Sequence, residues 1–261
     1  MSNEHKKYLK KIKKRKFLIK FTQIMIIIIF LLIWQVLADL KIINTFIFSS
    51  PKNVLNTIIN LYKTNNLFNH IGVTLYELLI SFILGSTIGI SISWLLWSNN
   101  FIAKVLDPYL TILNSLPKVA LGPILIIWVG ANTKSIIVMA LLISTIITIM
   151  NVYQSFISTD NNKIKLFESF KATKLQIFFK LVLPSNYPNI ISTLKINLSM
   201  SLVGIIMGEF LVSKEGIGYL IVYGSQIFNL NLVMSGIFIL CLITIVLYYL
   251  ITYIEKKLIK I

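Results

Sequence analysis

Charged residues are scarce in this chain, and cysteine and histidine are scarcer still. Only 13% of the 261 residues are Asp, Glu, Lys or Arg, whereas a soluble domain carries about 25%. This shortage excludes an ordinary soluble enzyme and a disordered tail. The single cysteine, Cys241, excludes an intrachain disulfide and a cysteine metal cluster.

Residue patterns that carry catalysis or bind metals and nucleotides are missing as well. The two histidines, His5 and His70, have no cysteine or carboxylate at metal-ligand spacing, and no H-E-x-x-H occurs. We therefore expect no catalytic residue and no metal site, which argues against an intramembrane enzyme. The phosphate loop G-x-x-x-x-G-K-[ST] is also absent. The chain is thus expected to hold no cofactor and to hydrolyse no ATP by itself.

Positive charge, by contrast, is abundant and unevenly placed. The chain has 25 Lys and Arg against nine Asp and Glu, a net charge of +16. Nine of the cations precede residue 21, directly before an uncharged run, Phe21–Ala38. A basic flank beside an apolar run is the positive-inside pattern, so it indicates a lipid bilayer and no nucleic acid as partner. These cations are Lys6, Lys7, Lys10, Lys11, Lys13, Lys14, Arg15, Lys16 and Lys20.

The apolar run after these cations is expected to be a membrane span and not a cleaved signal. A signal peptide has an apolar region of about 7–15 residues followed by a small-x-small cleavage site. Here the run reaches 18 residues, and its end, Val36-Leu37-Ala38-Asp39-Leu40, contains no such cleavage site. We therefore assign residues 1–20 to a basic cytoplasmic arm and about Phe21–Leu40 to a first span.

Long apolar segments predict an all-α polytopic membrane protein with about six transmembrane helices. A crossing helix needs about 20 apolar residues, and four further segments reach that length with few charges. Another segment, Phe101–Gly130, contains Pro108, Pro117 and Pro123 and is expected to be kinked or broken. Ser49–Asn69 has helical apolar spacing and predicts a short amphipathic surface helix. The four clean segments are about Gly72–Trp97, Ser135–Tyr153, Asn189–Val212 and Leu232–Ile254.

The distribution of cations supports six spans with the N-terminus inside. With this topology 19 Lys and Arg lie on the cytoplasmic side and five outside, and Lys118 is left undecided. Both termini are then cytoplasmic, and so is the charged segment Gln154–Pro188. We expect a multi-pass protein of the cytoplasmic membrane, with a transmembrane domain at residues 21–254 and a cytoplasmic tail at 255–261.

Small and polar residues recur on one face of several spans. Small residues stand four apart at positions 81, 85, 89 and 93, and again at Gly204 and Gly208. This spacing lets helices approach closely, either within the chain or against a second copy. A polar stripe avoids lipid, either as a hydrogen-bond seam or as the lining of a pathway. The stripe residues are Ser144, Thr148, Asn151, Asn197 and Ser201.

Two glutamates, Glu77 and Glu209, lie within or at the rim of predicted spans. A carboxylate inside a membrane is a functional hypothesis by default. Both residues are near the predicted outer ends of their spans, where water reaches. A solvated or lysine-paired structural role therefore stays open beside a role in gating or in the substrate path.

The segment of about residues 160–184 has the pattern of a short basic helix. Apolar residues at 164, 167, 170, 175, 178 and 182 recur at helical spacing. Pro184 and Pro188 are expected to stop the helix before the fifth span. From the residues alone, such a helix lies on the lipid surface or docks on a protein, and both remain open.

This segment and its flanks resemble the permease subunits of binding-protein-dependent ABC importers. Those subunits have a cytoplasmic E-A-A-x-x-x-G motif followed by L-P. The branch for nitrate, sulfonate, taurine and thiamine precursors adds G-E-F and then G-L-G-Y-L-I. The similarity covers most of residues 21–254 and lies in the order and spacing of the motifs. The matching residues are Ala172-Thr173-Lys174-Leu175-Gln176-Ile177-Phe178, Leu183-Pro184, Gly208-Glu209-Phe210, Gly216-Ile217-Gly218-Tyr219-Leu220-Ile221, Ser50-Pro51 and the run Leu116–Pro123 through Trp128–Gly130.

Two positions depart from the motif of that family. Counted back from Leu183-Pro184, the motif's Glu falls on Lys165 and its Gly on Lys171. Glu168 lies on nearly the same helical face as Lys165 and offers a displaced carboxylate. A partner with a matching acidic cleft is one explanation of this exchange.

The resemblance implies a fold, partners and a mechanism. The expected fold is the MetI-like ABC importer permease fold, in which two permease chains, here a homodimer, form the path. A separate ABC ATPase subunit binds ATP and receives the cytoplasmic loop, while an extracytoplasmic solute-binding protein delivers a small solute. The implied coupling residues are Lys165, Phe167, Glu168, Phe170, Lys171, Ala172, Thr173, Gln176, Leu183 and Pro184. The path or gate residues are Ser144, Thr148, Asn197, Ser201, Gly204, Gly208 and Glu209, with Gly216 and Gly218 as a hinge in the loop Lys214–Gly218.

Two further interpretations stand beside this one. A secondary carrier transports without an ATPase and often has inverted repeats with broken helices, and the sequence has no convincing internal repeat. A non-transporting membrane scaffold is the other alternative.

Overall fold

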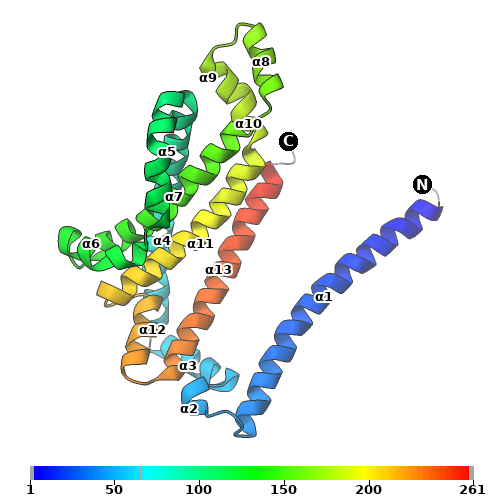
Figure 1. Cartoon of the computed structure of the whole chain (residues 1–261). Helices are drawn as coiled ribbons and strands as arrows, with labels where there is room; N and C mark the ends of the chain where they lie inside the picture. The colour runs from blue at the N-terminus through cyan, green and yellow to red at the C-terminus, as the bar shows by residue number, and fades with distance from the viewer. Residues whose placement is uncertain (1–2, 65, 259–261) are drawn as a thin grey trace.

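The computed structural model describes residues 3–64 and 66–258, which form helices joined by short turns (Figure 1). No strand occurs in these residues, which confirms the predicted all-α class. The long helices are α1(Asn3–Asp39), α4(Asn66–Ser98), α7(Thr133–Ile157), α11(Tyr187–Val212) and α13(Leu230–Leu258). The short elements are α2(Thr45–Phe48), α3(Pro51–Lys63), α5(Asn100–Ser115), η1(Lys118–Leu121), α6(Gly122–Val129), α8(Asn161–Ser169), α9(Lys174–Ile177), η2(Phe178–Val182), α10(Leu183–Ser185) and α12(Ile217–Gln226).

The five long helices are long and apolar enough to cross a membrane, and they confirm the clean predicted spans. Each predicted span lies inside one of them, apart from Leu40, which follows the last residue of α1. The basic arm is helical from Asn3 onward and continues into the first span without a break. Of the predicted arm and tail, residues 1–2 and 259–261 lie outside the described residues.

The predicted surface helix and the predicted broken span are both present. Ser50 caps α3 by accepting a hydrogen bond from the Asn53 N–H at 3.2 Å, and Pro51 stands at its first position, where proline is favoured. The segment after α4 forms two helical parts, which meet at an angle of 85°. The bend falls at Leu116, whose extended backbone is the conformation favoured before Pro117. Counted as one span, this bent pair brings the total to six.

The core of the bundle consists of α4, α7 and α11, which pack against one another along their lengths. Small residues make this close approach possible, because a glycine lets a neighbouring helix come within the space of a side chain. The glycines at the predicted spacing pack against neighbouring helices of the same chain. This confirms the prediction that the small residues serve packing within the chain. The contacting pairs are Gly85 with Ser144, Gly89 with Thr148, Gly204 with Ala140 and Gly208 with Ile136.

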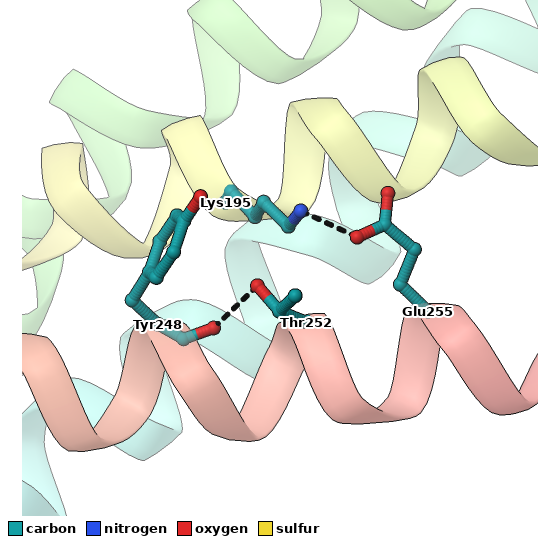
Figure 2. Close-up of polar contacts among 4 residues, drawn as sticks. All are labelled: Lys195, Tyr248, Thr252 and Glu255. Carbon is teal, nitrogen blue, oxygen red and sulfur yellow. Dashed lines mark hydrogen bonds and ion pairs between the residues drawn. The ribbon is translucent and has the colours of Figure 1, made fainter. Parts of the chain in front are cut away.

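Helix α13 is joined to α11 by a half-buried ion pair near its C-terminal end (Figure 2). Lys195 Nζ lies 2.6 Å from Glu255 Oε2, and it also lies 5.4 Å from the ring centroid of Tyr248. The Thr252 hydroxyl donates to the Tyr248 carbonyl at 2.9 Å, within the same turn of α13. One cation thus contacts two side chains of α13 and ties the end of that helix to the core.

Helix α1 stands apart from the rest of the bundle, and the other elements sort to two ends (Figure 1). Ala38 is the one buried residue of α1 among those whose burial is described, and α1 contacts chiefly α3. The start of α1, the segment α8–α10 and the end of α13 lie toward one end of the molecule. Helices α2, α3 and α12 lie toward the other end. The start of α1 and the end of α13 thus lie toward the same end, as expected for a chain that crosses a membrane an even number of times.

The helix stop predicted before the fifth span is confirmed. The helical path continues from α9 through the π-helical turn η2 into α10, where Pro184 lies in the first turn. The path ends at Asn186, between the two prolines, and Pro188 lies in the first turn of α11.

Candidate functional site

The segment α8–α10 projects from one end of the bundle (Figure 1), and its tip exposes apolar side chains. Phe170 lies in the turn between α8 and α9 with 77% of its surface exposed. Leu166 and Leu175 flank it and are also more than half exposed. Lys165 and Lys171 are exposed beside them. The tip is therefore an exposed apolar spot in a stretch of chain that carries more lysine than glutamate.

A cluster of aromatic side chains fixes this segment to the core helices. The Phe178 ring of η2 is buried, and its centroid lies 5.3 Å from those of Phe156 in α7 and Trp97 in α4. The side chains of the segment that pack against this cluster are Ile164, Phe167, Ala172 and Leu183. We expected both Phe167 and Phe170 to be free for a partner, but Phe167 is half-buried in the chain's own core. Of these two, Phe170 is therefore the ring that the segment offers.

Two of the predicted coupling residues shape the segment locally. The Thr173 hydroxyl accepts from the Gln176 N–H at 3.3 Å, while Gln176 Oε1 accepts from the Thr173 N–H at 2.9 Å. This reciprocal pair is a capping box that starts α9. Glu168 is exposed, and it forms no ion pair with any residue that the structure describes. Its role as a displaced motif carboxylate stays a prediction.

Lys171 holds a left-handed backbone conformation, with φ of +57°. This is the position where the resembling family has glycine. A residue with a Cβ pays about 1–2 kcal/mol for that conformation, and glycine avoids the cost. We expect Lys171→Gly to stabilise the tip by about 1 kcal/mol, measured as slower amide hydrogen exchange in α8 and α9. Lys171→Ala is the control, because it removes the same charge but keeps the Cβ. Equal exchange rates in the two variants would contradict the strain at Lys171.

At the opposite end of the bundle, Glu209 of α11 holds the turn that begins α12. Its Oε1 accepts from the Thr74 hydroxyl at 2.7 Å, and its Oε2 accepts from the Gly218 N–H at 2.5 Å. A Cβ at Gly216 or Gly218 would collide with the Glu209 side chain. Gly216 also has φ of +101°, which L side chains rarely adopt. The two glycines of the predicted hinge are thus required by this contact.

Helix α4 supplies two more acceptors for the same turn. His70 Nδ1 accepts from the Gly216 N–H at 3.0 Å, and the Thr74 Oγ1 accepts from the Ile217 N–H at 2.8 Å. No role of His70 or Thr74 was predicted from the sequence. A signal was available, since His70, Thr74 and Glu77 recur at i, i+4 and i+7, which places them on one face of a helix.

Glu77 lies beside Glu209 and lines a cavity of about 610 Å³. Both glutamates are buried, at 0% and 1% exposure. Neither carboxyl oxygen of Glu77 has a hydrogen-bond donor among the described residues, and its polar neighbours are the Glu209 carboxyl and the Thr133 hydroxyl. A solvated or lysine-paired role is therefore wrong for both residues. Position near the end of a span could not reveal that the turn before α12 packs on Glu209, or that Glu77 is buried beside Glu209.

The polar stripe predicted along α7 and α11 is closed off between these helices. Asn197 Nδ2 donates to Thr148 Oγ1 at 2.6 Å, and the Ser201 hydroxyl donates to Asn197 Oδ1 at 3.1 Å. Ser144 and these three residues are fully buried, whereas Asn151 is exposed outside the stripe. The contacts describe a hydrogen-bond seam, and a place for these residues in a path stays a prediction.

Comparison with known protein families matches residues 81–260 to the family described as "Binding-protein-dependent transport system inner membrane component". This match spans more than half of the chain, including all of α7, α11 and α12.

Individual relatives agree with this match. The chain is 30% identical to a "Probable ABC transporter permease protein" of Haemophilus influenzae, over 87% of this chain and 91% of the relative. It is 29% identical to a formylaminopyrimidine transport permease protein of Halalkalibacterium halodurans, over 72% and 75% of the two chains. It is 20% identical to a taurine transport system permease protein of Escherichia coli, over 82% and 80%.

Solved structures share the fold. An inward-facing structure of the MetNI methionine ABC transporter superposes with a TM-score of 0.62 and 19% identity, over 73% of this chain and 93% of the other. A bacterial ABC transporter involved in alginate import gives 0.66 and 14%, over 96% and 99%. These likenesses confirm the predicted MetI-like permease fold.

Proposed function

This chain belongs to the family of binding-protein-dependent transport system inner membrane components, and we propose that a separate ATPase subunit drives it through the segment α8–α10. It is an ABC importer permease of the MetI type, with several membrane-spanning helices. In this proposal the ATPase subunit binds ATP and the permease chain binds none. The permease chain moves a small solute across the cytoplasmic membrane.

The exposed tip at Phe170 carries the proposal. An aromatic ring that is 77% exposed, outside the apolar spans and in a stretch rich in exposed lysine, suits a protein groove with an apolar floor and an acidic rim. Lys165 and Lys171 replace the Glu and Gly of the family motif, and both are exposed at this tip. We therefore expect the groove of the ATPase subunit to be acidic where it meets them.

The aromatic cluster supports the transmission of movement from the tip to the spans. Phe178 contacts Phe156 of α7 and Trp97 of α4, so a push on the segment reaches two core helices at once. Because packed side chains resist compression, these helices are expected to tilt as rigid bodies. The tilt would shift α11 relative to α4 at the opposite end of the bundle, where Glu209 of α11 holds the turn before α12.

Further partners follow from the same proposal. The side that carries α8–α10 and both termini is cytoplasmic, and an extracytoplasmic solute-binding protein docks at the α12 end. A second copy of this chain completes the path, since the polar side chains of the seam are closed off within one copy. The solute belongs to the sulfonate, nitrate, taurine or thiamine-precursor classes. Named relatives transport taurine or formylaminopyrimidine, which supports this range.

Affinity purification of the tagged chain from its own cells in mild detergent tests the coupling. We expect a nucleotide-binding subunit to co-elute, identified by photolabelling with azido-ATP and by mass spectrometry. A parallel purification from untagged cells is the control. Recovery of the bare chain, together with ATP-independent solute transport in liposomes, would instead identify a secondary carrier. Recovery of the bare chain without transport would favour a scaffold.

A further inference from the structure

Two carboxyl groups lie together inside the bundle, where the turn before α12 meets α4 and α11. Glu77 and Glu209 are 0% and 1% exposed, and the Glu209 carboxyl is a polar neighbour of Glu77. Although Glu77 lines the cavity, both of its carboxyl oxygens are closed off from solvent. The other carboxyls whose burial is described are exposed, or in Glu255 paired with Lys195. Glu77 and Glu209 are therefore a buried pair of acids without such a partner.

The basic side chains nearest this pair do not neutralise it. His70 Nδ1 accepts from the Gly216 N–H at 3.0 Å, so this nitrogen carries no proton and the ring is neutral. Lys134 in the first turn of α7 and Lys214 before α12 are exposed, and neither forms an ion pair within the described part of the chain. Two ionised carboxylates in contact here would repel each other, with little water to screen them.

The two carboxyls differ in the hydrogen bonds that they accept. Glu209 accepts from the Thr74 hydroxyl with one oxygen and from the Gly218 N–H with the other. Glu77 accepts from no donor in the described residues, since even the neighbouring Thr133 hydroxyl forms no hydrogen bond with it. Donors stabilise a carboxylate, whereas burial without donors favours the neutral acid. A neutral carboxyl also has an O–H group that it can donate to a neighbouring acceptor.

We propose that these two carboxyls share one proton, which Glu77 carries as a carboxylic acid and donates to the Glu209 carboxylate. The single negative charge then lies on the residue whose two oxygens both have donors. Glu77 is a positioning residue in this arrangement, because its O–H holds the Glu209 carboxylate against Gly218. The bound proton thus helps to keep the first turn of α12 in place. This inference concerns the α12 end alone and does not depend on an ATPase partner.

Infrared difference spectroscopy of the purified chain tests for the proton directly. The detergent is dodecyl maltoside, which has no ester carbonyl. At neutral pH we expect the native chain to have the C=O stretching band of a carboxylic acid, which carboxylates lack and which shifts after exchange into D₂O. Glu77→Gln should lose this band, whereas Glu215→Gln should retain it, because Glu215 is an exposed carboxylate. A native chain without the band, or a Glu77→Gln chain that keeps it, would overturn the proposal.

Thermal unfolding of the same variants distinguishes the donor from the acceptor. In Glu77→Gln an amide N–H replaces the O–H donor, so we expect a midpoint close to the native value. Glu209→Gln should lower the midpoint clearly, because an amide has one acceptor oxygen for the two donors, Thr74 and Gly218. Equal losses in the two variants would show that Glu77 does not act as a donor to Glu209.

The pH dependence of this midpoint gives a further readout. Loss of the shared proton would leave two adjacent anions, so the native midpoint should fall as the pH rises into the alkaline range. Glu77→Gln has no such proton to lose, so its midpoint should fall less. Parallel curves for the two chains would contradict a shared proton. The other titratable groups around the pair are the same in both chains and cancel in this comparison: His70 in α4, Lys134 in α7, Lys214 and Glu215 in the turn, and Tyr219 in α12.

Discussion

Replacing Phe170 with aspartate is expected to abolish solute uptake while the chain reaches the membrane at its native level. Phe170 is 77% exposed and does not belong to the cluster around Phe178, so its loss leaves the core intact. In the groove of an ATPase subunit, the new carboxylate would be buried without a partner, which costs about 3 kcal/mol or more, a loss of at least about 100-fold in binding. The measurement is uptake of labelled aminopyrimidine and of labelled taurine by whole cells, with the membrane fraction quantified by immunoblot.

Phe101→Asp is the matched control for this substitution. Phe101 is also 77% exposed and lies in the first turn of α5, outside the segment α8–α10, where a carboxylate suits the helix N-terminus. We expect this variant to transport normally. Ala172→Asp is a less specific test, because Ala172 packs against the Phe178 cluster and its replacement disturbs the segment itself. Native uptake by the Phe170 variant would refute coupling through this tip.

Adding a single methyl group at Gly204 is expected to destabilise the bundle. A Cβ at this position would fall on the backbone of Ala140 in α7, so α7 and α11 must move apart to admit it. Overpacking of this kind costs about 1–3 kcal/mol, and here it opposes backbone atoms, which cannot rotate away. We expect Gly204→Ala to lower the thermal unfolding midpoint of the purified chain in detergent.

Gly72→Ala is the control for the Gly204 substitution. It makes the same change in a long helix, but no atom lies within 4 Å of the added Cβ. Alanine favours helix over glycine by about 0.8–1.0 kcal/mol, so this variant should unfold at the native temperature or slightly above it. If both variants have the same midpoint, close packing at Gly204 does not limit the stability of the bundle.

The spans were predictable because they depend on length and polarity, which the sequence displays directly. An uncharged run of 18 residues after a basic arm admits few structures, and Pro117 marked the place of the bend. The four-residue spacing of Gly204 and Gly208 likewise predicted a close helix contact. It could not decide between the same chain and a second copy, because both use the same small surface.

Contacts between distant residues were not predictable in the same way. His70 and Gly216 are 146 positions apart, and nothing in either local pattern indicates the other. The glutamates were misjudged because distance from the end of a span does not measure burial when another helix covers that end. The helix stop before α11 was predictable from Pro184 and Pro188, but the π-helical turn η2 was not, because such turns are rare and this one carries no recognised pattern.

The first N–H groups of helix α12 are capped by side chains from α4 and α11. Gly216, at its cap position, has no side chain to offer, so the N–H groups of residues 216, 217 and 218 are satisfied by His70, Thr74 and Glu209. A helix with its own cap can fray one residue at a time. Here the first turn cannot loosen without releasing bonds to α4 and α11 together. The α12 end should therefore open in one cooperative step that breaks several hydrogen bonds together. Such an all-or-none opening would limit solute leakage between transport cycles.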